Sequence, residues 1–127
     1  MAKFAHDDVL DGGLNVIKNA AVKVLLISAY TAGDSYATVQ ANKLAEATMA
    51  FGDYSIASNA GNRVLTTATG KTAVVSTSAA GTPDLHFAFT DGSAKVLWVT
   101  DELSNQAITA GNTITFPALS YTTRQPV

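Results

Sequence analysis

The sequence predicts one mainly β domain, a single-domain β-sandwich or barrel-like fold with one N-terminal helix. From about Asp53 onward, Thr and Val alternate with small or apolar residues between turns rich in Gly, Asn and Asp, which is typical of short strands. Residues 7 to 21 form the one stretch with a convincing helical spacing of apolar side chains. The length of 127 residues suits one domain with a sizeable core.

The helix is predicted from one apolar face, made of Leu10, Leu14, Ile17 and Ala21. Asp7 or Asp8 can cap its first turn. Gly12-Gly13 weakens it, because each glycine inside a helix costs about 1 kcal/mol relative to alanine. The helix therefore depends on docking against something else. The chain divides into an N-terminal arm (residues 1–8), the helix (9–21) and a mainly β body (23–127).

The β body begins with a strand at 23–30, whose near-continuous apolar centre predicts burial on both faces and a central position. The stretch 31–42 is predicted as an exposed loop, and 43–50 fits neither helix nor strand. Further strands are expected at 54–57, 63–69, 72–77, 85–90 and 94–100, with a last one through Ile114 and Phe116 to Pro117.

Two hairpins are predicted among these strands. Strands 63–69 and 72–77 should pair through Gly70-Lys71, and strands 85–90 and 94–100 through Asp91-Gly92-Ser93. In the second hairpin, alternation places Leu85, Phe87 and Phe89 with Val96 and Trp98 on one face, and His86, Ala88, Leu97 and Val99 on the other. The expected core includes Leu25, Ile27, Phe87, Phe89, Trp98, Ile114 and Phe116.

Composition argues against several classes of function. A net charge of -2 with only eight Lys and Arg gives no general attraction to phosphates, so we expect no nucleic-acid partner. The longest apolar run has four residues, against about 20 for a membrane-spanning helix, so we expect no membrane partner. The opening residues lack the apolar core of a signal peptide, which predicts synthesis in the cytoplasm without export.

Candidate catalytic groups are few, and we expect no enzyme activity, metal or cofactor. Gly70-Lys71-Thr72 ends like a phosphate-binding loop, but Leu65 stands where the first glycine is required. The adjacent residues His6, Asp7 and Asp8 suit helix capping better than a converging metal site.

His86 is predicted to be partly buried and hydrogen-bonded, with no nearby sequence feature that supplies an orienting carboxylate. Asp101-Glu102 is interpreted as a solvated turn, since neighbours on a strand point to opposite faces.

The candidate binding residues are Lys3, Phe4, Tyr30 and Tyr36, predicted as a partner interface. Tyrosine is enriched in interfaces, and it can also stack on sugar rings. Strands that are apolar on both faces, together with a weak helix, predict a homo-oligomer or a lattice-bound protein. The segment before Asp8 is expected to be ordered by that partner.

Three stretches carry a resemblance to a known group: AHDDVLDGGLNVIKNAAVKVLLISAY, KLAEATMAFGDYSIASNAGNRVLTTATGKTAVV and SNQAITAGNTITFPALSY. Together they resemble small virion structural proteins of tailed bacteriophages, of the capsid decoration or cement type. The resemblance implies a multi-copy protein on the capsid surface of the virion, with the major capsid protein or other virion proteins as partner.

Other functions stay open at this point. A head–tail connector or a tail structural component is compatible with the same resemblance. A carbohydrate-binding β-sandwich would use Trp98 or the tyrosines as stacking platforms, although alternation predicts that Trp98 is buried. A small hydrolase is the weakest alternative, because no nucleophile, base and orienting group can be named together.

Overall fold

The computed structural model describes residues 2–127 and confirms the mainly β fold with one main N-terminal helix. The helices are α1 (Asp7–Ala20), the short α2 (Tyr36–Ala41) and the single 3₁₀ turn η1 (Phe51–Asp53). The strands are β1 (Lys23–Ile27), β2 (Lys43–Thr48), β3 (Tyr54–Asn59), β4 (Asn62–Thr67), β5 (Lys71–Val74), β6 (His86–Thr90), β7 (Val96–Asp101), β8 (Thr113–Phe116) and β9 (Ser120–Thr123).

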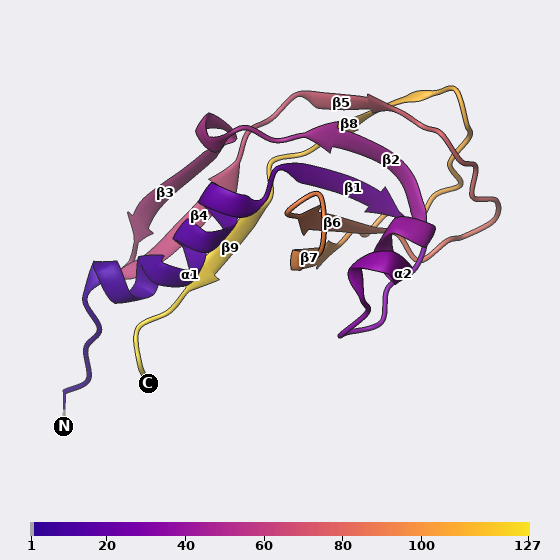
Figure 1. Ribbon diagram of the computed structural model, residues 1–127. Coiled ribbons are helices and arrows are strands. Elements are labelled where there is room, and N and C mark those ends of the chain that lie inside the picture. The colour runs from indigo at the N-terminus through magenta and orange to yellow at the C-terminus, as the bar shows by residue number, and fades with distance from the viewer. Residues whose placement is uncertain (1) are drawn as a thin grey trace.

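The strands form three antiparallel sheets, with the orders β2-β1-β6-β7, β3-β4-β9 and β5-β8. Helix α1 packs against the β3-β4-β9 sheet, and both chain ends lie at that end of the molecule, away from α2 (Figure 1). One buried apolar cluster contains residues from all three sheets and from α1. None of the helices described within residues 2–127 is long and apolar enough to cross a membrane.

Strand β1 is central and buried on both faces, as predicted. Val24 and Leu26 face the main core. Leu25 and Ile27 face a small second core with Val39. Of the seven predicted core residues, six are buried and Ile114 is half-buried at the edge of the main cluster.

The prediction that 31–42 is an exposed loop is wrong, because α2 forms there and covers the second core. Ser35 caps this helix by accepting a hydrogen bond from the Thr38 N–H at 3.2 Å. Val39 is the one fully buried side chain of α2. Val39 is the only large aliphatic side chain among these six residues, so the stretch shows no helical period of large apolar residues, and Ser35 at the cap is its main sequence signal. Residues 43–48, which had no assignment, form β2.

The predicted pairing of 63–69 with 72–77 is also wrong. Strand β4 pairs with β3 and β9, while β5 pairs with β8. The hairpin between β3 and β4 turns at Ala60 and Gly61, which both have positive φ, 52° and 83°. Two positive φ values match the right-handed twist of hairpin strands, but alanine rarely adopts them. Strand β9 follows Pro117 and was not predicted.

The hairpin of β6 and β7 is confirmed, with Phe89 opposite Trp98. A bulge between Phe89 and Thr90 brings Val96 opposite Thr90. Val96 consequently packs in the second core, whereas Leu97 packs against the main core. The predicted faces of Val96 and Leu97 are therefore wrong, because one extra residue in a strand reverses the alternation beyond it.

Helix α1 covers Asp7–Ala20, which confirms the helical stretch predicted at 7–21, and it begins two residues before the arm–helix boundary placed at residue 9. His6 is the N-cap, and its Nδ1 accepts a hydrogen bond from the Asp8 N–H at 3.1 Å, so the cap is neither Asp7 nor Asp8. The two carboxylates lie in the first turn, where the helix dipole favours negative charge. Asp11 anchors the helix to β4 through two hydrogen bonds from Arg63, at 2.8 and 3.1 Å.

Candidate functional site

The four predicted interface residues lie in two separate places. Lys3 and Phe4 lie on the arm beside the C-terminus, and Tyr30 and Tyr36 lie around α2 at the other end of the molecule (Figure 1). They do not form one surface.

The arm is held by the chain's own C-terminal segment, a contact that sequence reasoning missed. Ala5 and the Gln125 side-chain amide exchange two hydrogen bonds, both 2.9 Å long. The Lys3 ammonium donates to the Val127 carbonyl at 2.6 Å. Phe4 stays 77% exposed between these contacts. The arm thus has an intrachain anchor, so the prediction that a partner orders the segment before Asp8 is wrong, and its exposed aromatic side chain can contact another molecule.

Tyr30 and Tyr36 are half-buried and already have contacts within the chain. The Tyr36 hydroxyl accepts a hydrogen bond from Gln40 Nε2 at 3.0 Å. The Tyr30 ring lies against the His86 ring, with 5.7 Å between centroids. Both side chains stabilise the end of the four-stranded sheet that carries α2.

An apolar groove lies between α1 and the strands β7 and β9. This helix groove is a cavity of about 290 Å³ lined by Gly13, Val16, Ile17, Leu97, Tyr121 and Thr123. Val16 is 53% exposed and Tyr121 is 41% exposed, so its walls present apolar surface to solvent. Val9, two turns before Val16 on the same side of the helix, is also exposed.

The helix groove was not predicted as a site, although its signal was present in the sequence. Val9 and Val16 are seven residues apart and therefore share a helix face, which is distinct from the buried face of Leu10, Leu14 and Ile17. Apolar residues on a second helix face indicate a surface that another molecule can cover.

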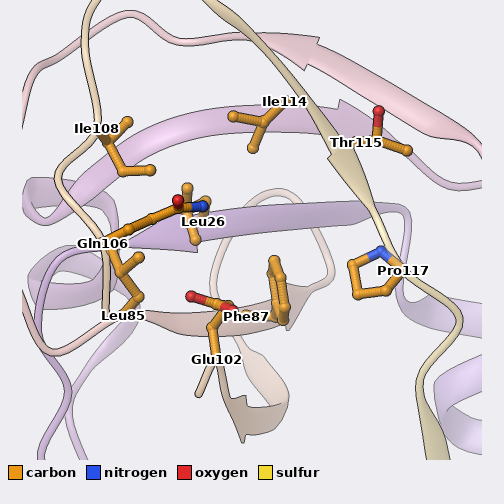
Figure 2. A pocket seen from close by; sticks show the side chains of 9 residues that line it. All are labelled: Leu26, Leu85, Phe87, Glu102, Gln106, Ile108, Ile114, Thr115 and Pro117. Carbon is orange, nitrogen blue, oxygen red and sulfur yellow. The ribbon is translucent and has the colours of Figure 1, made fainter. Parts of the chain in front are cut away.

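A second pocket, of about 210 Å³, lies over the main sheet (Figure 2). Its walls are mostly apolar, formed by Leu26, Leu85, Phe87, Ile108, Ile114 and Pro117. Glu102 and Gln106 are polar members of the lining, and the Glu102 carboxylate accepts hydrogen bonds from Ser104 N–H and Oγ at 3.1 and 2.6 Å. The pocket has room for one apolar side chain or a small apolar molecule.

The structure places two carboxylates near His86, which is partly buried and hydrogen-bonded as predicted, although neither carboxylate is within hydrogen-bond distance of the ring. Asp101 lies opposite His86 in the register of β6 and β7, with its Oδ1 3.7 Å from Nε2. Asp84 Oδ1 lies 3.9 Å from Nδ1, and the Asp84 carbonyl lies 3.0 Å from the same nitrogen. Asp101 is thus the last residue of β7 rather than part of a free turn.

Lys71 of the incomplete phosphate-loop signature has a structural role. Its ammonium lies 2.8 Å from Asp53 Oδ2 and donates to the Thr48 carbonyl at 3.1 Å. The hydrogen bond from Lys71, helped by the Ala50 N–H, holds the pKa of Asp53 below its ordinary value. The pair joins β5 to the η1 turn.

Trp98 offers no open face to a sugar ring. It is 8% exposed and stacks on Phe89 with 4.5 Å between centroids, while Tyr121 meets it edge-on at 5.6 Å. Tyr121 therefore forms a link between the aromatic core and the helix groove.

No protein-family model, curated protein or solved structure matches this chain. A functional proposal therefore rests on the residues and geometry described above.

Proposed function

We propose that this protein is a multi-copy structural protein of a tailed-bacteriophage virion, and specifically a capsid decoration protein that binds the outside of the head lattice. Its partner would be the major capsid protein, and its place the surface of the virion. The helix groove is the observation that carries the proposal. It is a solvent-accessible, mostly apolar surface beside α1, the longest helix, and such a surface suits contact with another protein.

The physical argument concerns the two faces of α1. One face is buried against the protein, while Val9 and Val16 on the other remain in water. Burying apolar surface is worth roughly 25 cal/mol per Å², so covering both valines and the exposed part of Tyr121 favours association. Aromatic and apolar groups at the centre of a contact are typical of protein interfaces.

The resemblance of the sequence to virion proteins supports the same surface. Its first stretch, residues 5–30, supplies Gly13 and Val16 on one wall of the helix groove, and its last stretch, 104–121, supplies Tyr121 on another. Two of the resembling segments, far apart in the chain, therefore meet at the proposed contact.

The test is binding to purified heads of the phage whose genome carries the gene. Val16→Asp places a charge in the helix groove and should weaken co-sedimentation with expanded heads at least tenfold, because the charge would be desolvated on contact. Val74→Asp is the matched control, since Val74 is 65% exposed on β5 and lies outside the groove lining. It should bind normally.

The arm is tested by a truncation that ends at Phe4, because His6 caps α1 and a longer deletion would damage the helix. Loss of Phe4 should weaken head binding with an unchanged far-ultraviolet spectrum. Binding of the intact protein to tails or necks instead of heads would favour a tail or connector role. The proposal would be rejected if the protein bound none of these particles. It would also be rejected if no capsid, portal or terminase genes lay near its gene.

A further inference from the structure

A compact group of metal-binding side chains lies at the end of the four-stranded sheet beside Tyr30. Asp84, His86 and Asp101 each offer one ligand atom, and these atoms all lie within 4.8 Å of one another. His86 begins β6 and Asp101 ends β7, and the two are paired across the hairpin. On its other side His86 is paired with Ile27 of β1, so the backbone beneath it is part of a continuous sheet.

The imidazole ring is 15% exposed and is oriented so that one nitrogen faces the Asp101 carboxylate. Nδ1 lies 3.0 Å from the Asp84 carbonyl, which fixes Nδ1 as the donor and leaves the lone pair on Nε2. Among residues 2–127, no hydrogen bond is made to Nε2, and the nearest Asp101 oxygen is 3.7 Å away. A histidine that donates one ring N–H to a backbone carbonyl and presents the other nitrogen is the arrangement found in metal ligands.

The separation of His86 Nε2 and Asp101 Oδ1 suits two ligands of one small cation, and Asp84, whose Oδ1 lies 3.9 Å from Nδ1, would have to turn toward Nε2 to become the third. Zn²⁺ binds imidazole nitrogen and carboxylate oxygen at about 2.0–2.2 Å, so two ligands at the tetrahedral angle lie about 3.4 Å apart. The observed 3.7 Å between Nε2 and Asp101 Oδ1 needs only a small side-chain rotation to reach this value. The Asp84 and Asp101 carboxylates are 64% and 54% exposed, which gives them the freedom to turn toward a common centre.

We propose that His86, Asp101 and Asp84 form a binding site for a divalent transition metal of the Zn²⁺ type. Three protein ligands leave a fourth position for water. The nitrogen ligand distinguishes this site from one for Ca²⁺ or Mg²⁺, which prefer oxygen alone. The sequence predicts no metal site because the two histidines are far apart in the chain. The structure shows that one histidine and two carboxylates, Asp84 just before β6 and Asp101 at the end of β7, supply three ligand atoms.

The site is tested by titrating the untagged protein with Zn²⁺ in a calorimeter and with Co²⁺ in a spectrophotometer. We expect one saturable site per chain and visible Co²⁺ absorption. Asp101→Asn should lower the Zn²⁺ affinity at least tenfold, and His86→Asn should abolish the Co²⁺ signal. Asp101 is an exposed side chain, so its variant should fold normally, which circular dichroism would verify.

His6→Asn is the matched control, because asparagine preserves the helix cap while removing the only other imidazole. Its Zn²⁺ affinity should equal that of the unmodified protein. The proposal is wrong if Zn²⁺ shows no saturable binding, if Asp101→Asn binds as tightly as the parent chain, or if His6→Asn removes the binding. Equal affinity for Mg²⁺ or Ca²⁺ would overturn the assignment to a transition metal. None of these outcomes depends on binding to heads.

Discussion

At the scale of single residues, Tyr54 shows how one buried polar group is satisfied. Its hydroxyl donates to the Ala21 carbonyl at 2.7 Å, and its ring meets Phe89 edge-on. Tyr54→Phe should reduce the free energy of unfolding by about 1–2 kcal/mol, because a buried carbonyl loses its donor while the ring packing is kept. Urea unfolding measures this change. Tyr121→Phe, at a partly exposed ring, should change stability by much less, and equal effects of the two variants would contradict the argument.

The carboxylate of Asp91 stabilises the turn between β6 and β7 by accepting backbone hydrogen bonds. Its Oδ1 accepts hydrogen bonds from the N–H groups of Ala94, Lys95 and Ser93 at 2.8–2.9 Å. These bonds lower the pKa of Asp91 to about 2, from 3.8. A lowered folded-state pKa stabilises the protein above the unfolded value, and this stabilisation disappears as the pH falls from about 4 toward 2.

We therefore expect Asp91→Ala to lower the melting temperature most above pH 4, with the difference from the parent protein shrinking as the pH approaches 2. Thermal unfolding followed by circular dichroism across this range provides the measurement. A difference that is independent of pH would show that the charge on Asp91 is not responsible.

At the scale of elements, the glycines of α1 can be compared with a glycine that the fold requires. A Cβ atom added at Gly12 meets nothing within 4 Å, so Gly12→Ala should stabilise the protein by about 0.5–1 kcal/mol through helix propensity. Gly92 has φ +80°, and a Cβ there would lie 3.2 Å from Val22 Cγ2. Gly92→Ala should destabilise the hairpin. Chemical denaturation of both variants measures whether the free energy of unfolding rises or falls. Stabilisation by Gly92→Ala would be inconsistent with the turn geometry.

The elements that could be predicted are those with a local signal. The β6–β7 hairpin follows from Asp91-Gly92, and α1 follows from four apolar residues that share one face over about three turns. The pairing of β5 with β8 joins residues about 40 positions apart, so no short turn sequence between them predicts it. The bulge beside Phe89 adds one residue to β7 and reverses the alternation beyond it, so alternation predicted the face of Trp98 correctly and that of Leu97 incorrectly.

At the scale of the whole molecule, the candidate sites depend on contacts that no single segment contains. The helix groove needs α1, β7 and β9 together, and the His86 site needs the register of a hairpin. Lys3 and Phe4 could be named from the sequence as arm residues. The arm is held through Ala5, however, whose hydrogen-bond partner Gln125 lies 120 positions further along the chain. Local patterns therefore predict the groups that can bind, while the tertiary contacts decide which of them lie together.

The continuous main core also predicts how the protein unfolds. Trp98 and Tyr54 belong to the same buried cluster, which contains residues of all three sheets and of α1. Loss of packing in one sheet therefore exposes apolar surface of the others, which favours a single cooperative transition. Trp98 fluorescence, which reports on the β6–β7 hairpin, and far-ultraviolet circular dichroism, which includes α1, should give coincident urea curves with one midpoint. An earlier transition in either signal would mean that α1 with the β3-β4-β9 sheet unfolds as a separate unit.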